Sequence, residues 1–189
     1  MMSTALKSFI SKVVSQIRAQ PEPADCVLAL APVMLDLLEQ ADTFLEPQHY
    51  ASDAGGYTRN LIYEAADDSM SLYSLVWLPG QWTPVHDHGS WGVVGVLEGI
   101  LEERSYVRLS PDRGADENID LVRGGVVLLR QGAVTTFVPN PDHIHMTGVP
   151  PQRPRAVSLH LYGRMMSSFN IYDLDARSRK RVHVAHNQS

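Results

Sequence analysis

Several features that would define a functional class are scarce or missing in this sequence. Cys26 is the only cysteine among 189 residues, so no internal disulfide can form and a reducing compartment is expected. No run of about 18 apolar residues occurs, and the N-terminus has no charged region followed by an apolar one, which argues against a membrane span and a secretion signal. We therefore expect a cytoplasmic protein in which Cys26 is a small core residue.

Positive charge is also scarce. The 16 basic side chains are outnumbered by 21 acidic ones, which gives a formal charge of −5. They form neither a basic block nor a stripe interleaved with aromatic residues, so nucleic acid and anionic membranes are not expected as partners. Hydrophobic residues make up 44 % of the chain, which is enough for a full core, and we expect residues 1–189 to form a single domain.

Two helical stretches are predicted within residues 1–45. In Thr4–Arg18, apolar residues recur at three- and four-residue steps with basic residues between them, the pattern of an amphipathic helix. Ala24–Ala41 carries a stripe of leucine and methionine, and Pro32 inside it is expected to split the helix. Neither stretch contains a chemical motif, so both are expected to pack against a core.

From Tyr57 onward the chain reads as short strands separated by turns, a pattern typical of a β-barrel or sandwich. The predicted strands are 57–64, 71–78, 83–86, 92–97, 100–107, 118–122, 126–129, 135–138, 143–148 and 156–162. The predicted turns include Gly124-Gly125 and Pro139-Asn140-Pro141-Asp142. Residues 50–170 are therefore expected to form a β-barrel. The polar stretch 177–189 is expected to be a solvated tail, with an extra edge strand as the alternative.

A metal-binding strand is predicted at Pro84-Val85-His86-Asp87-His88. Because side chains alternate along a strand, the imidazoles of His86 and His88 lie on the same face. Two neutral imidazoles aimed at one point suit a borderline transition metal. A third ligand would come from a distant strand, where His145 and His143 share a face and compete for the role. The histidines without such a context, expected at the surface, are His49, His183 and His186.

An acid is missing beside this histidine pair. Gly80, the pair and Gly99 have the spacing of the first motif of the cupin superfamily, which continues with a glutamate three or four residues after the second histidine. That position falls on Gly92 here, and no acid occurs between Asp87 and Glu98. The looser second motif is represented by Gly132, Pro139 and His145.

The missing acid has a chemical consequence. Two histidines and a carboxylate form the usual facial triad of non-haem iron oxygenases. Three histidines without a carboxylate leave the full charge of a divalent metal in the site. Such a site favours an anionic ligand bound directly to the metal, and a thiolate, soft and anionic, is the best candidate.

Three runs carry a resemblance to a known family. They are Tyr57-Thr58-Arg59-Asn60-Leu61, Pro84–His88 with Gly99, and Ala156-Val157-Ser158-Leu159-His160-Leu161-Tyr162, with Ile144-His145 between the last two. Over roughly residues 50–170 the chain resembles the cysteine dioxygenase type I family of thiol dioxygenases. The resemblance implies a mainly β fold, a jelly-roll-like cupin barrel with N-terminal α-helices. It also implies an Fe(II) enzyme that adds both atoms of O2 to the sulfur of a small thiol-bearing acid, giving a sulfinic acid.

The resemblance assigns roles to individual residues. The implied ligands of Fe(II) are His86, His88 and His145. The implied members of an outer hydrogen-bond relay are Ser158, His160 and Tyr162, which alternate along one strand. Arg59 matches the arginine that pairs with the substrate carboxylate, a task that suits its planar fork. Tyr57 would share its face and line the pocket, and Tyr162 would reach the substrate and oxygen.

The chain departs from the family pattern in two places. Animal members have a cysteine, crosslinked to the relay tyrosine, where this chain has Gly92, so no thioether can form. The residues after His145 do not follow the family's basic pattern, which leaves the identity of the substrate open. Arginine rather than glutamine at position 59 favours L-cysteine, with 3-mercaptopropionate and mercaptosuccinate as alternatives.

Two other functions fit the same residues. A three-histidine site holding zinc or manganese could catalyse hydrolysis, isomerisation or a non-thiol dioxygenation. A non-enzymatic metal-binding or sensor module is the second, although it gives Arg59 and the relay no purpose. Trp82 and Trp91 flank the metal strand and are equally compatible with pocket and core. A small-molecule thiol and O2 are the expected partners of a protein that we expect to be monomeric.

Overall fold

The computed structural model describes residues 2–139 and 142–187. Two helices come first, α1 (Thr4–Ala19) and α2 (Pro23–Leu38), followed by short 3-10 helices at Ala41–Thr43 and Pro47–Tyr50. The predicted split of the second helix is wrong, because α2 continues through Pro32. The carbonyl that Pro32 leaves without a donor belongs to Leu28, whose side chain is exposed, so water can satisfy it. None of the helices in the described chain is long and apolar enough to cross a membrane.

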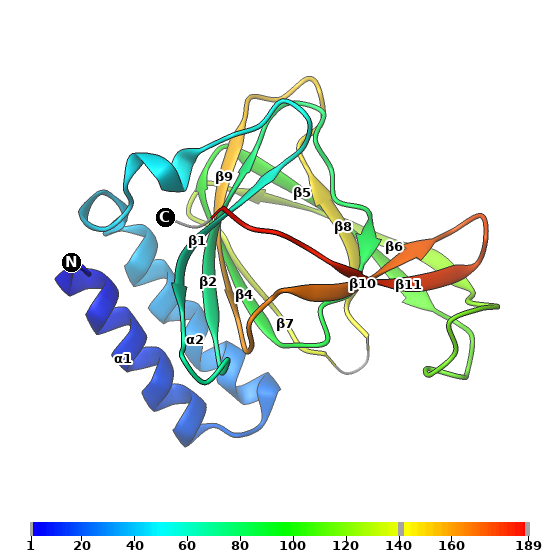
Figure 1. The fold of residues 1–189 in the computed structure, drawn as a ribbon, viewed down its shortest axis with the longest axis horizontal. Coiled ribbons are helices and arrows are strands. Elements are labelled where there is room, and N and C mark those ends of the chain that lie inside the picture. The colour runs from blue at the N-terminus through cyan, green and yellow to red at the C-terminus, as the bar shows by residue number, and fades with distance from the viewer. Residues whose placement is uncertain (1, 140–141, 188–189) are drawn as a thin grey trace.

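Within the residues that the structure describes, eleven strands follow the helices. They are β1 (Thr58–Glu64), β2 (Ser71–Trp77), β3 (Val85–His86), β4 (Gly92–Glu98), β5 (Ile100–Arg108), β6 (Leu121–Arg130), β7 (Val134–Phe137), β8 (Ile144–Gly148), β9 (Ala156–Tyr162), β10 (Ser168–Asp173) and β11 (Ser178–His183). The strands form two antiparallel sheets, in the orders β1-β2-β9-β4-β7 and β11-β10-β3-β8-β5-β6. The sheets face one another across the core (Figure 1). The predicted cupin, jelly-roll-like fold is confirmed, as two facing sheets rather than one closed barrel.

The five-stranded sheet is buried on both faces. Both helices cover its outer face (Figure 1), where α2 packs on β4 and β7. Every residue of β2 and β9 is buried, and their side chains alternate between the two faces. Leu159 and Leu161 of β9 belong to the cluster beneath the helices. Ser158, His160 and Tyr162 consequently point the other way, into the space between the sheets.

The second half of the barrel differs from expectation at Gly124-Gly125. These residues lie inside the continuous strand β6 and form no turn. The pairing of β5 with β6 shifts register between Arg104 and Tyr106, as it does at a β-bulge. A Cβ atom on Gly124 would lie 2.5 Å from Ser105 Oγ, so glycine is needed there for close approach of two strands. The strand predictions at 118–122 and 126–129 therefore describe parts of one longer strand.

The described part of the C-terminal stretch contradicts the predicted polar tail and agrees with the alternative, an extra edge strand. Residues 178–183 form β11 at the edge of the six-stranded sheet, and its basic residues suit an exposed edge. Asn187 then returns to β1, where its N–H donates to Arg59 O at 2.8 Å and its carbonyl accepts from Leu61 N at 3.0 Å. The end of the described chain beside β1 is visible in Figure 1. Residues 188–189, and Asn140-Pro141 of the predicted turn, lie outside the described residues.

Candidate metal centre and its cavity

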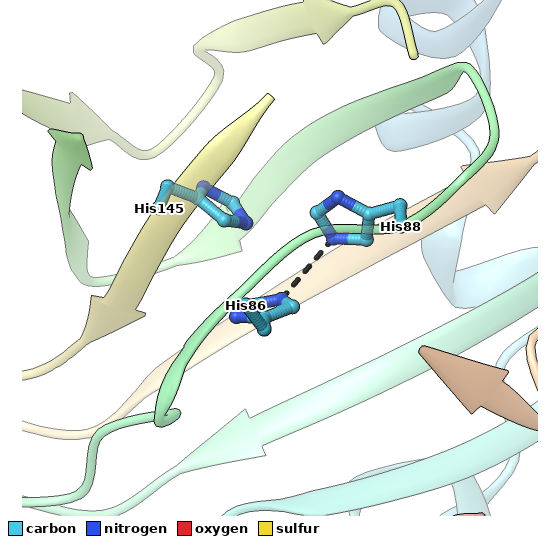
Figure 2. Close-up of side chains that lie close together, drawn as sticks. All are labelled: His86, His88 and His145. Carbon is cyan, nitrogen blue, oxygen red and sulfur yellow. Dashed lines mark hydrogen bonds between the residues drawn. The ribbon is translucent and has the colours of Figure 1, made fainter. Parts of the chain in front are cut away.

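The histidines of the predicted metal site come together between the two sheets. β3 pairs with β8, and His86 lies directly opposite His145. The rings of His86, His88 and His145 point toward one another (Figure 2), and one nitrogen of each lies within 4.8 Å of the others. His86 Nε2 and His88 Nε2 are 3.2 Å apart. All three side chains are buried.

These nitrogens fit a transition-metal ion. His86 Nδ1 lies 3.0 Å from Pro84 O; since a carbonyl only accepts, Nδ1 carries the proton and Nε2 presents a lone pair. His145 Nε2 is buried and has no hydrogen-bond partner in the described part of the chain. Burial, and then the neighbouring histidines, hold the pKa values of His86 and His88 well below 6.5. Neutral imidazoles with unshared lone pairs aimed at one point are the donor set such an ion prefers.

His143, the rival third ligand, lies outside this group. Its ring stacks on Phe137 with centroids 4.5 Å apart, and its Nε2 lies 3.6 Å from Glu103 Oε1. The other oxygen of Glu103 lies 3.2 Å from His145 Nδ1. Burial raises the pKa of Glu103, but the interactions with His143 and His145 outweigh burial and hold this pKa well below 4.5. An ionised carboxylate therefore lies behind His145, on the side away from His86 and His88.

Arg59 supplies an anion-binding group to the same cavity. Its side chain is buried, and its guanidinium lies over the Tyr73 ring, 4.8 Å from the centroid. Nη2 donates to Met166 O at 2.6 Å, whereas Nη1 is buried and has no partner among the described residues. A buried cationic donor without an acceptor is a site for a ligand anion. Tyr57 lines the cavity beside it, stacked on Trp77 with centroids 4.7 Å apart.

The predicted relay forms a continuous hydrogen-bonded chain. Ser158 Oγ lies 2.8 Å from His160 Nε2, and His160 Nδ1 lies 3.1 Å from Tyr162 Oη. Trp77 Nε1 donates to Ser158 Oγ at 3.0 Å. Because His160 Nε2 is the acceptor within reach of the Ser158 hydroxyl proton, His160 donates from Nδ1 to Tyr162 Oη. The hydroxyl proton of Tyr162 is then free to be donated into the cavity.

Fifteen of the described residues line this cavity. The ones that the sequence reasoning missed are Leu75, Trp77, Thr83, Val94, Phe137, Thr147, Met166 and Phe169. Trp82 and Trp91, the two proposed from proximity to the metal strand, are not among the lining residues. Trp82 carries Arg104 over its ring at 4.1 Å, and Trp91 packs against the core beneath the helices. A strand-alternation argument would have found Trp77, which shares a face with Tyr73 and Leu75.

Phe137 explains why position 92 has no side chain. A Cβ atom on Gly92 would lie 2.2 Å from Phe137 Cζ, far inside van der Waals contact. The Phe137 ring stacks on His88 with centroids 4.4 Å apart. The place that a glutamate or a cysteine would take in the motifs discussed above is thus filled by an aromatic ring, and that side of the metal site is apolar.

Asp87 holds the metal strand from its other face. Its carboxylate accepts from Tyr172 Oη at 2.8 Å and from Asn170 Nδ2 at 2.9 Å, which ties the strand to β10. As expected from strand alternation, it points away from the two histidines. His49 contradicts the expectation of a surface position, because it is buried and its Nδ1 accepts from Glu46 N at 2.9 Å as a helix cap. His186 is half-buried and His183 is exposed.

The buried relay histidine gives a pH-dependent stability. Burial, and then the charges of His145 and Arg59, lower the pKa of His160 to about 3. The unfolded chain takes up this proton near pH 6.5 and the folded chain does not, so stability is full above that pH and falls as the pH drops toward about 3. In metal-free protein, the lowered pKa of His160 is expected to decrease the free energy of unfolding by about 2 kcal/mol between pH 7 and pH 5.

Urea denaturation of metal-free protein across that pH range checks this expectation. His160→Gln should show a shallower loss of stability with falling pH, whatever its stability at pH 7. His183→Gln, at an exposed position, should keep the slope of the unmodified protein. Parallel slopes for all three proteins would show that His160 is protonated in the folded state.

Comparison with known proteins gives one family and several distant folds. The family model described as cysteine dioxygenase type I matches residues 33–175. A double-stranded β-helix protein from Klebsiella pneumoniae is 16% identical, with 70% of this chain and 94% of that one covered and a TM-score of 0.47. TT1209 from Thermus thermophilus is 16% identical, with 64% and 95% covered and a TM-score of 0.45. A cupin-like protein from Thermotoga maritima is 18% identical, with 60% and 75% covered and a TM-score of 0.41.

Proposed function

Because the chain belongs to the cysteine dioxygenase type I family, we propose that it is an Fe(II)-dependent thiol dioxygenase acting on L-cysteine. The product would be the sulfinic acid, with both atoms of O2 on sulfur and no external reductant consumed. One observation carries the proposal. A single buried cavity is lined by the three convergent histidines and by Arg59, whose Nη1 has no partner among the described residues, so one small molecule can reach both with its thiol and its carboxylate.

The three histidines would hold the iron. Bound by His86, His88 and His145, Fe(II) supplies Lewis acidity toward the thiol and the redox chemistry that O2 requires. The side chains bring no negative charge of their own to the ligand positions. This supports an anionic sulfur ligand over a neutral substrate.

Arg59 orients the substrate. Its Nη2 is already committed to Met166 O, so the guanidinium is fixed and Nη1 is left to donate to the incoming carboxylate. The Tyr73 ring beneath the guanidinium restricts its movement further. A fixed cation and a metal site in the same cavity would convert the reaction into one between positioned groups.

Tyr162 would donate its hydroxyl proton to the reacting oxygen or to the bound substrate. Burial raises the pKa of this phenol well above 10, so it stays protonated at neutral pH and acts as a donor. The relay sets its direction, because His160 Nδ1 occupies one acceptor position on Tyr162 Oη. Because the pKa of His160 is about 3, the ring is neutral at physiological pH. It therefore accepts from Ser158 and donates to Tyr162.

The apolar cavity walls would limit the access of water to the reacting groups. Phe137, Phe169 and Val94 contribute apolar surface around the histidines. Exclusion of water strengthens the interaction of Arg59 with an anion, since the effective dielectric constant falls. A site closed to water would also limit side reactions during the oxidation.

Oxygen uptake tests the proposed function. Ferrous protein should consume about one O2 per thiol with L-cysteine, and mass spectrometry should find a product heavier by two oxygen atoms. 3-Mercaptopropionate and mercaptosuccinate, assayed in parallel, rank the alternative substrates. Zinc-loaded protein is the control and should consume none. Stoichiometric zinc with no iron in freshly purified protein, together with no uptake on any of the three thiols after iron loading, would reject the proposal.

A further inference from the structure

Glu103 lies behind one of the three convergent histidines. It belongs to strand β5, which contains none of the three. On β5, Leu101 is fully buried, and Glu103, two residues on, points to the same inner face. β5 pairs with β8 so that Ser105 lies opposite His145. Glu103 is therefore the diagonal neighbour of His145 across the two strands, a distance that a long side chain spans. The carboxylate reaches His145 Nδ1 at 3.2 Å, and its side chain is only 14% exposed.

This contact fixes the state of the His145 ring. A carboxylate only accepts hydrogen bonds, so Nδ1 carries the proton, and the lone pair is on Nε2. Nε2 is the atom that is buried without a partner, on the side of the ring that faces His86 and His88 (Figure 2). Metal-bound histidines in proteins usually have a carboxylate or carbonyl on the second nitrogen. In His86 the partner of the second nitrogen is a carbonyl, because Nδ1 lies 3.0 Å from Pro84 O.

We propose that Glu103 is a positioning residue that sets the tautomer and the orientation of His145 for metal binding. The inference rests on the proposed function only in needing a metal at the three histidines, and it is independent of the substrate. It also corrects the expectation that no acid lies near the site. An acid is present, but it acts through a ligand and leaves the ligand positions to neutral nitrogen.

The second oxygen of Glu103 faces His143. His143 Nε2 lies 3.6 Å from Oε1, and the His143 ring is nearly parallel to Phe137, at 3°. Phe137 also stacks on His88, at 27°, and the centroids of His88 and His143 lie 5.9 Å apart. Glu103, His143 and Phe137 are thus in contact with one another in that order, and the group contacts His145 through Glu103 and His88 through Phe137. His143 contacts the carboxylate and the Phe137 ring and lies outside the three-histidine group.

A competing arrangement uses the same atoms differently. Glu103, His143 and His145 also lie close enough to form a cation site of their own, which would use His145 Nδ1 in place of its proton. His145 can also turn to Thr147 Oγ1, 3.3 Å from Nδ1, if the carboxylate is lost. The experiment therefore has to separate a hydrogen-bond acceptor from a ligand.

Titration of metal-free protein with Co(II), followed by visible absorption, measures affinity and stoichiometry without any turnover. Glu103→Ala is expected to weaken Co(II) binding by about 10–100-fold. Glu103→Gln keeps an oxygen acceptor for the Nδ1 proton and should stay within about threefold of the unmodified protein. Glu102→Ala is the matched control, since Glu102 points to the other face and pairs with Arg104 Nε at 2.8 Å, and it should bind normally.

Two results would overturn the positioning role. Equal affinity of Glu103→Ala and the unmodified protein, with both folded by circular dichroism, would show that the carboxylate does not act on the metal site. Two Co(II) ions per chain, one of them lost in both Glu103→Ala and Glu103→Gln, would show that Glu103 is a ligand. Failure of the proposed function would instead appear as normal Co(II) binding without oxidation of any thiol by the iron-loaded protein, so the two failures can be told apart.

Discussion

Replacement of His86 by alanine is expected to abolish metal binding and to lower thiol oxidation by more than about 10³-fold, since a metal contributes several kcal/mol to the stabilisation of developing charge. His86 is the ring closest to both partners, 3.2 Å from His88 Nε2 and opposite His145 in register. Its loss leaves two imidazoles from separate segments, one just after β3 and one on β8. Iron content by elemental analysis and O2 uptake measure the two effects.

The control for this variant must also be a histidine. His183→Ala removes an exposed ring at the end of β11 and should leave iron content and turnover unchanged. Full occupancy by iron in His86→Ala, with normal turnover, is the outcome that contradicts the three-histidine assignment. Because His86 is buried, circular dichroism should accompany the measurement to confirm that the variant has folded.

Arg59→Gln is expected to lower kcat/KM for L-cysteine by about 10²–10³-fold, mainly through KM. Loss of one partner from a buried, hydrogen-bonded ion pair costs about 2–5 kcal/mol, and the upper part of that range is not expected because glutamine can still donate one hydrogen bond. The effect should be specific to the carboxylate. 2-Aminoethanethiol, which has the thiol and the amine of cysteine but no carboxylate, should react equally slowly with both proteins.

A surface arginine provides the comparison. Arg155 makes a bidentate pair with Glu98, at 2.9 and 3.0 Å, on the exterior of the barrel; exposed pairs of this kind contribute little to stability. Arg155→Gln should therefore keep the kinetics of the unmodified protein. If Arg59→Gln and Arg155→Gln behave alike with L-cysteine, the carboxylate is bound elsewhere.

The parts of the site that could be predicted are those set by alternation within one strand. The spacing of His86 and His88 places both rings on one face, and the same rule aligns Ser158, His160 and Tyr162. These are local properties of an extended backbone, which the sequence pattern specifies directly. The coarse order of helices and then strands follows from periodicity in the same way.

The parts that could not be predicted depend on which strands become neighbours. Glu103 reaches His145 only because β5 lies beside β8, and Phe137 reaches Gly92 because β7 pairs with β4. Neither pairing is encoded in the spacing of nearby residues. The edge strand in the C-terminal stretch remained only an alternative for the same reason, since the hydrogen bonds of Asn187 to β1 join segments that are far apart in sequence.

The contact between Gly92 and Phe137 constrains how this site can change. Any side chain at position 92 would collide with the ring, at 2.2 Å from its Cζ atom. A carboxylate or a thiol introduced there by a single substitution therefore requires the Phe137 ring to shift or to shrink. Shrinking Phe137 first would remove the support that stacks on His88. We therefore expect the two positions to be epistatic, so that a change from three histidines to two histidines and a carboxylate at this position is tolerated only when both residues change.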